Sequence, residues 1–81
     1  MISGLQIRAA RALLRWRAVE LAEASGLSLQ TVQRLEQHDG FPSGHMKTIN
    51  AVYRVLQDQG IEFLGTPDDA PGVRLHGAKK S

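Results

Sequence analysis

The side chains best suited to recognition chemistry lie between Leu29 and Arg34. The amide of Gln30 can bond the edge of an adenine through both its oxygen and its nitrogen, and the guanidinium of Arg34 can grip guanine in the same way. Gln33 adds a second amide, while Leu29 and the methyl group of Thr31 could touch a thymine methyl. These residue types suit contact with DNA bases, although every surface helix also needs a polar face.

Residues that could support catalysis are poorly placed. The chain has no cysteine, and His38, His45 and His76 follow no metal-ligand spacing. Asp68 and Asp69 lie side by side among turn-forming residues and do not form a placed acid and base pair. The glycines form no phosphate-binding loop. We therefore expect no enzyme activity, no metal and no cofactor.

Basic residues are concentrated at the start of the chain. The formal net charge is +2, but Arg8, Arg11, Arg15 and Arg17 all precede the first acidic residue. The first seventeen positions therefore carry +4, and the remainder carries −2, with six basic and eight acidic residues. This asymmetry suits docking on phosphate or on an acidic protein, and it equally fits a solvated helix face.

Length and composition limit the class of protein. The 81 residues, 42% of them apolar, suffice for one domain with a modest core. The lack of cysteine fits a reducing compartment. No segment approaches the roughly 20 apolar residues of a membrane span, and arginines interrupt the start of the chain where a signal peptide needs an apolar run. These features predict a cytoplasmic protein.

Helix caps and breakers predict four helices. Ser3 and Ser28 are good N-caps, and Gly26 can adopt the left-handed conformation that ends a helix. We expect helices over residues 5–16, 18–25 and 29–37, and a fourth that follows Ser43 and runs to about Gln59. Residues 38–44 are rich in glycine and proline and are expected to form a loop. The buried stripe of the fourth helix is expected to be Met46, Ile49, Val52, Tyr53 and Leu56, with Trp16 as another core aromatic.

The pattern changes after Gly60. Residues 61–64 and 73–75 are expected to be short strands, because the segment between them is dense in turn formers. Two strands alone are marginal in water, so they should either pair with a second copy of the chain or cover the junction of the first and fourth helices. We expect residues 1–64 to form the main domain and residues 65–81 a tail that ends in disorder.

Small and apolar residues of the second and third helices have a characteristic spacing. Two helices joined by a tight turn pack closely only where the contact residue is small, and Ala22 lies one turn before Gly26. Val32 follows, so that Ala, Gly and Val stand at offsets 0, +4 and +10. The apolar wedge between the helices is Leu21, Leu27, Val32 and Leu35. This spacing is typical of a DNA-binding helix-turn-helix.

The segments 21–28 (LAEASGLS) and 31–36 (TVQRLE) resemble the Xre/Cro-like helix-turn-helix family of bacterial and phage transcriptional regulators. The resemblance covers about residues 7–61. It implies a mainly all-α fold, a four-helix lambda-repressor-like bundle with a short C-terminal β-strand or hairpin tail. It also implies that residues 29–37 form the recognition helix, which enters the major groove of DNA.

The resemblance assigns roles to individual residues. It implies a structural ion pair between Arg11 of the first helix and Glu36 of the recognition helix. It places base contacts at Leu29, Gln30, Gln33 and Arg34. Arg17 and Lys47 are candidate phosphate contacts, which position a protein on DNA without reading its sequence.

Three positions favour a second function. The family usually has Ser or Thr followed by Gln where this chain has Arg17 and Ala18, and Leu29 is apolar at a base-reading position. An apolar spot with a polar rim also resembles a protein-docking patch. We therefore expect either a regulator that binds promoter or operator DNA or an antiactivator that binds and inhibits a transcription activator protein. The C-terminal strands are the candidate element for a homodimer.

Overall fold

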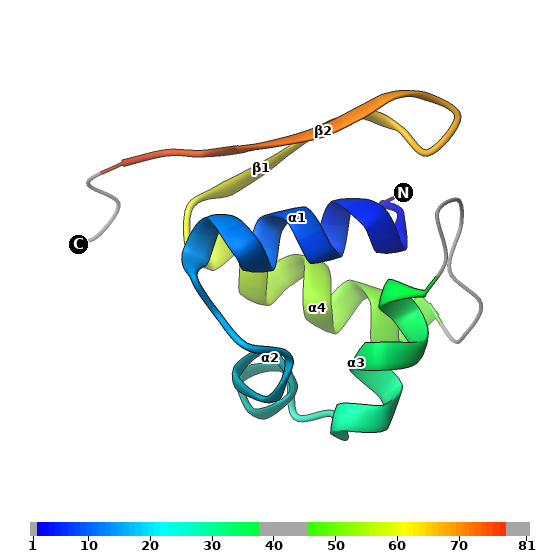
Figure 1. Ribbon diagram of the computed structural model, residues 1–81, viewed down its shortest axis with the longest axis vertical. Helices are drawn as coiled ribbons and strands as arrows, with labels where there is room; N and C mark the ends of the chain where they lie inside the picture. The colour runs from blue at the N-terminus through cyan, green and yellow to red at the C-terminus, as the bar shows by residue number, and fades with distance from the viewer. Residues whose placement is uncertain (1, 38–45, 78–81) are drawn as a thin grey trace.

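The computed structural model describes residues 2–37 and 46–77 and contains four helices followed by a β-hairpin (Figure 1). The helices are α1 (Gly4–Leu14), α2 (Ala18–Ser25), α3 (Leu29–Glu36) and α4 (Met46–Asp58). The strands are β1 (Ile61–Thr66) and β2 (Asp69–Leu75). The predicted 38–44 loop, the Ser43 cap, His38, His45 and residues 78–81 of the expected disordered end lie outside the described residues.

Helix α1 begins with a capping box. Ser3 Oγ accepts a hydrogen bond from the Gln6 backbone N–H at 3.1 Å, and Gln6 Oε1 accepts one from the Ser3 N–H at 2.9 Å. The helix ends at Leu14, two residues earlier than expected, because Arg15 adopts the left-handed conformation with φ of 60°. The predicted N-cap at Ser3 is confirmed.

The short helices α2 and α3 are joined by three residues, and they cross steeply, with α2 seen end-on in Figure 1. Gly26 ends α2 with φ of 70°, as predicted. Ser28 Oγ accepts a hydrogen bond from the Thr31 N–H at 3.1 Å and so caps α3, also as predicted. The turn is tied back to α2 because the Leu27 N–H donates to the Ala22 carbonyl at 2.9 Å.

Helix α4 buries a narrower stripe than its sequence predicts. Ile49, Val52 and Leu56 lie in the core, whereas Met46 is 55% exposed and Tyr53 is 36% exposed. The buried residues follow the spacing i, i+3, i+7, and Tyr53 lies one position off that stripe. Its ring stacks on Phe63 of β1 with a centroid distance of 5.2 Å. The prediction that Met46 and Tyr53 are buried is therefore wrong.

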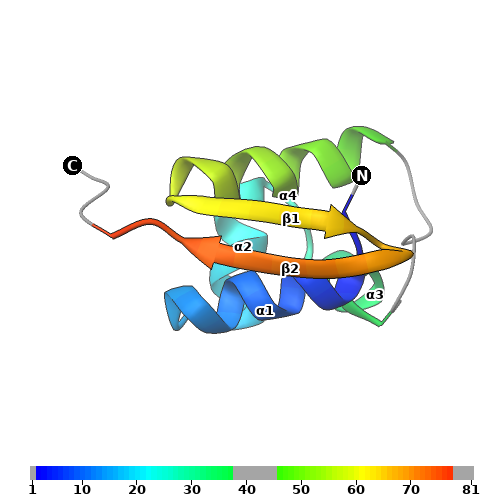
Figure 2. The same cartoon turned by 90° about the horizontal axis from the view of Figure 1, so that it is seen from above.

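The two strands form an antiparallel hairpin that lies across the helices (Figure 2). Strand β2 runs over α1 and β1 runs over α4. Ile61 is buried in the core, and Phe63 and Val73, which face each other across the hairpin, pack against that core. The hairpin therefore covers the junction of α1 and α4, which confirms one of the two roles expected for these strands.

The expectation of an all-α bundle with a short β tail is wrong. Strands take up 19% of the described residues, and helices take up 59%. The hairpin is longer than expected, and its strands form part of the closed core over α1 and α4. Ile61, Phe63 and Val73 pack toward the helices, whereas Glu62 and Arg74 are on the outer side, so one face of the sheet is buried.

A β-bulge shapes the tip of the hairpin. Leu64 pairs with Gly72 and Thr66 pairs with Asp69, so Gly65 faces two residues, Ala70 and Pro71. Gly65 has φ of 70°, and a Cβ atom at this position would collide with the Ala70 carbonyl oxygen and lie 2.6 Å from that of Asp69. The bulge is thus compatible only with glycine at Gly65.

We predict that Gly65→Ala lowers the free energy of unfolding by about 2 kcal/mol, through backbone strain and carbonyl collisions. Gly72→Ala is the matched control, because its Cβ would only touch the Leu64 Cβ at 3.9 Å. Urea denaturation of both variants measures the difference. Equal stability of the two variants would contradict the role of Gly65.

In the ranges that the structure describes, no helix has the length and apolar character needed to cross a bilayer.

Candidate functional site

A two-pronged ion pair joins α1 to the end of α3. Arg11 Nε donates to Glu36 Oε2 at 2.9 Å, and a terminal nitrogen of the same guanidinium donates to Glu36 Oε1 at 3.0 Å. The Glu36 side chain is only 8% exposed and that of Arg11 is 22% exposed. The predicted structural pair of Arg11 and Glu36 is confirmed.

Further hydrogen bonds fix this corner of the molecule. Arg11 also donates to the Trp16 carbonyl, and Arg8 donates to the Glu36 carbonyl, each at 2.9 Å. The hydrogen bond with Glu36 raises the pKa of Arg11 above its ordinary value, against the opposing effect of burial. Both arginines therefore help to hold α3 against α1.

The ion pair determines the charge of the outer surface of α3. Glu36 is the one acidic residue of this helix, and it is turned inward. The exposed residues of α3 and its C-cap are Leu29, Gln30, Gln33, Arg34 and Gln37, which we call the α3 face. This face presents three amides, one cation and one apolar side chain. It carries no carboxylate.

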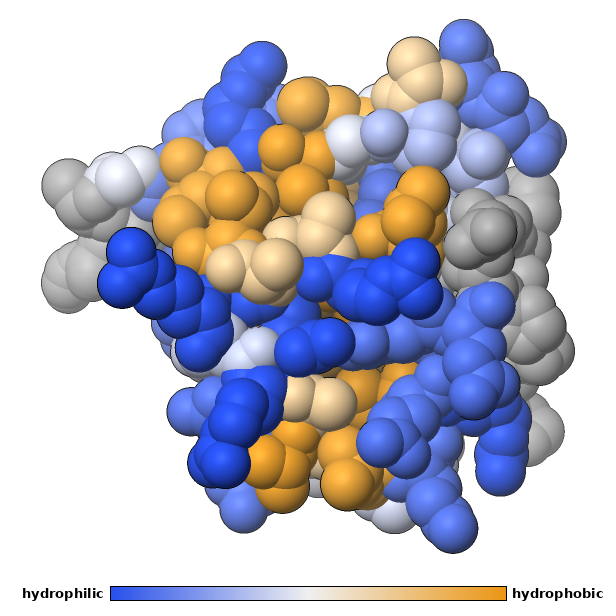
Figure 3. All heavy atoms as spheres, in the orientation of Figure 1, coloured by the Kyte–Doolittle hydropathy of each residue, from blue (hydrophilic) through white to orange (hydrophobic). Residues whose placement is uncertain are grey.

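Two shallow hollows follow the α3 face. One, of about 250 Å³, is lined by Gln30, Gln33, Arg34 and Gln37. The other, of about 450 Å³, is lined by Arg8, Arg11, Ala18, Gln33, Glu36 and Gln37. Because Gln33 and Gln37 line both, the hollows form one surface from the start of α2 to the outside of α3. Figure 3 shows hydrophilic side chains gathered over α3 beside apolar atoms over α2.

Gln37 was not singled out by the sequence analysis, although its spacing gives a signal. It lies four residues after Gln33 and three after Arg34, so it continues the same side of the helix. Its exposure and its place in both hollows add a third amide to the surface.

The packing residues of the helix pair lie where the spacing predicts. Ala22 is 3% exposed, and Val32 is completely buried. Leu21 and Leu35 are also in the core. A small residue at Ala22 lets α2 and α3 approach each other, and this approach fixes the direction in which the α3 face points.

Arg17 lies at the N-terminus of α2 and is 80% exposed. An arginine cannot accept a hydrogen bond from the helix, so the usual cap is missing. Glu20 supplies half of a capping box instead, because its Oε1 accepts the Arg17 backbone N–H at 2.6 Å. The sequence does not predict this role of Glu20, since a capping box is normally recognised by Ser or Thr at the cap position.

Four other residues differ in their surroundings. Thr31 Oγ1 hydrogen-bonds to Ser28 Oγ at 2.8 Å, so its hydroxyl serves the helix cap. Ala18 lines the same hollow as Gln33, and Leu29 is not among the residues that line it. Lys47 is exposed on α4 and lines a separate pocket between α4 and α2.

The hairpin carries one polar cluster on its outer face. Glu62 Oε1 lies 2.8 Å from His76 Nε2 and 3.2 Å from a terminal nitrogen of Arg74. The hydrogen bond with His76, together with the charge of Arg74, holds the pKa of Glu62 below its ordinary value. Within residues 2–37 and 46–77, no group of three or more His, Asp or Glu side chains could hold a metal ion.

Comparison of the chain with protein-family models, with curated proteins and with solved structures gave no match.

Proposed function

We propose that this protein is a transcriptional regulator that reads promoter or operator DNA in the cytoplasm with its α3 face. The observation that carries the proposal is the withdrawal of the Glu36 carboxylate into the ion pair with Arg11. A carboxylate on the outer side of α3 would repel phosphate, whereas the amides and the guanidinium of Arg34 attract it or hydrogen-bond to bases.

The side chains of the α3 face suit the major groove. Gln30 and Gln33 can bond adenine, and Arg34 can bond guanine. Arg17 is 80% exposed at the N-terminus of α2 and lies 3.8 Å from Glu20 Oε1, an exposed contact that it can exchange for a phosphate beside the groove. One short helix reads only a few base pairs, so specific binding would use two copies on half-sites about one helical turn apart.

A second candidate function is binding of a transcription activator protein by the same surface, as an antiactivator. The observation in its favour is Leu29, which is 40% exposed at the start of α3. An exposed apolar side chain with polar neighbours is typical of protein interfaces. The two candidates differ in the residue that dominates binding, Arg34 for DNA and Leu29 for a protein.

We predict that Arg34→Ala weakens DNA binding about tenfold, because one base or phosphate contact of a guanidinium is lost. The measurement is an NMR titration of the labelled protein with a random-sequence duplex at about 50 mM and about 200 mM salt. Shifts should concentrate on Arg17, Gln30, Gln33 and Arg34 and should weaken steeply at the higher salt concentration. Arg74→Ala is the matched control, since Arg74 is an exposed arginine on the hairpin.

An intact fold with no shifts on the α3 face at low salt would contradict DNA binding. The antiactivator function would then be tested by searching for a protein partner, with Leu29→Asp as the control variant. Leu29→Asp should abolish a complex centred on an apolar side chain. A partner that binds this variant as tightly as the parent would contradict that function as well.

A further inference from the structure

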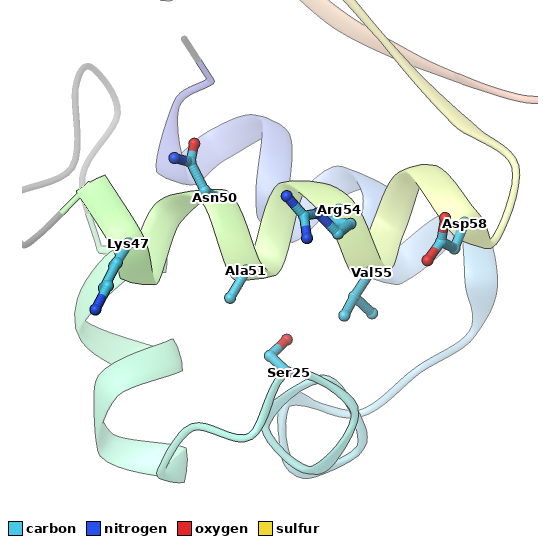
Figure 4. Close-up of a pocket in the computed structure, with 7 residues that line it drawn as sticks. All are labelled: Ser25, Lys47, Asn50, Ala51, Arg54, Val55 and Asp58. Carbon is cyan, nitrogen blue, oxygen red and sulfur yellow. The ribbon is translucent and has the colours of Figure 1, made fainter.

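A pocket of about 450 Å³ lies between α2 and α4 and shares no lining residue with the α3 face (Figure 4). Its lining residues are Ser25, Lys47, Asn50, Ala51, Arg54, Val55 and Asp58. Its volume is in the range of small-molecule sites, which often occur between the helices of small domains. The pocket combines an apolar floor with a polar rim, so it can hold a ligand that has both kinds of surface.

Three hydrogen-bond donors form one side of this pocket. Lys47, Asn50 and Arg54 are three and four residues apart, so they lie on adjacent turns along one side of α4. In the part of the chain that the structure describes, no acidic side chain lies within salt-bridge distance of Lys47 or Arg54. Two cations that flank an amide, neither of them in salt-bridge contact with a carboxylate, favour an oxyanion as the ligand group.

The floor of the pocket carries an unsatisfied polar group. Ser25 Oγ is buried and has no hydrogen-bond partner among the described residues. Figure 4 shows its hydroxyl directed from α2 toward α4, close to Ala51 and Val55. A buried hydroxyl without a partner is unfavourable, so a ligand that enters between α2 and α4 and offers it a polar atom gains a hydrogen bond.

Asp58 limits the charge of the ligand. Its carboxylate lies one turn beyond Arg54, at the end of the pocket away from Lys47. The three charged groups therefore sum to +1, which suits a ligand with one anionic group, placed between Lys47 and Arg54. A second negative group near Asp58 would be repelled.

We propose that this pocket binds a small organic anion, a carboxylate or a phosphate ester. Its charged group lies between Lys47 and Arg54, and its apolar part rests on Ala51 and Val55. Such a ligand would connect α2 to α4. The pocket shares no residue with the α3 face, although its Lys47 is also the candidate phosphate contact of the sequence analysis.

The test is an NMR titration of the full chain with hexanoate, with phenyl phosphate and with hexanol, each at constant ionic strength. Saturable shifts of the Ser25, Asn50 and Ala51 amides are expected with one or both anions and not with hexanol. Preference for hexanoate would assign a carboxylate ligand, and preference for phenyl phosphate would assign a phosphate ester.

Substitutions at two charged residues of the rim should change the affinity for the anion in opposite directions. Arg54→Gln should weaken anion binding about tenfold, because a charge-assisted hydrogen bond is lost. Asp58→Asn should strengthen it, because a repelling carboxylate is removed. Arg74→Gln is the matched control and should leave the affinity unchanged. Absence of saturable shifts with either anion, equal binding of hexanol, or unchanged affinity in Arg54→Gln would overturn the proposal.

Discussion

Replacing Glu36 by alanine is expected to lower the free energy of unfolding by about 3 kcal/mol. In the parent protein the Arg11 side chain is only 22% exposed, and the substitution removes the carboxylate beside it. A buried charge that loses its partner is costly, because the remaining interior contacts replace only part of its hydration. For a domain of this size the loss corresponds to a decrease in Tm of about 15 °C. Thermal and urea unfolding followed by circular dichroism measure both quantities.

Two further variants separate the ion pair from a general effect of removing a carboxylate. Glu23 is exposed on α2, so Glu23→Ala should change stability by less than about 0.5 kcal/mol. The double variant Arg11→Met with Glu36→Leu removes both charges, and it should be more stable than Glu36→Ala alone. A loss below about 0.5 kcal/mol in Glu36→Ala would mean that the pair behaves like an exposed one.

The ion pair of Arg11 and Glu36 contributes both to the stability of the fold and to the surface of the candidate site. It holds α3 against α1 and withdraws the one acidic group of α3 from the outer surface. Glu36→Ala therefore tests whether the ion pair holds α3 in position, and it changes none of the side chains of the α3 face. At temperatures where this variant remains folded, we expect its α3 face to keep the chemistry of the parent.

The helices of the site are predictable from the sequence because their signals are local. Gly26 and Ser28 mark the end of α2 and the start of α3, and both act within a few residues along the chain. The pairing of Arg11 with Glu36 is different, since the two residues are 25 positions apart. That prediction came from the family resemblance and not from any local pattern.

The hairpin shows which features of the fold the sequence leaves open, namely the length of its strands and the choice between two positions. In the sequence, its strands are recognisable only as the short apolar segments 61–64 and 73–75. The strands extend further because a bulge places Gly65 opposite Ala70 and Pro71, and the sequence does not predict this bulge. The position of the hairpin over α1 depends on contacts between the two ends of the chain. Contacts between residues far apart in the chain produce no periodic pattern of apolar residues in the sequence.

Gln6 is the residue that fastens the hairpin to α1. Its side-chain amide donates to the carbonyl oxygens of Leu64 at 2.8 Å and Gly72 at 3.0 Å, one on each strand. Its Oε1 accepts the Ser3 backbone N–H, so the amide oxygen and nitrogen are both used. The side chain is 2% exposed, and water cannot replace these bonds. The sequence predicts the Ser3 cap, and the S-x-x-Q spacing is a capping-box signal for Gln6, but nothing local predicts the contact of Gln6 with the hairpin.

Gln6→Leu is expected to lower the free energy of unfolding by about 3 kcal/mol. Leucine has a similar size, so the loss comes from three polar groups, the Ser3 N–H and two carbonyl oxygens, that lose a hydrogen bond in a buried place. Loosening of the hairpin should also weaken the stacking of Tyr53 on Phe63, which near-ultraviolet circular dichroism detects. Gln59→Leu, at an exposed position, is the matched control. If both glutamine variants unfold at the same urea concentration, the hairpin is held by its apolar face alone, and Gln6 does not fasten it.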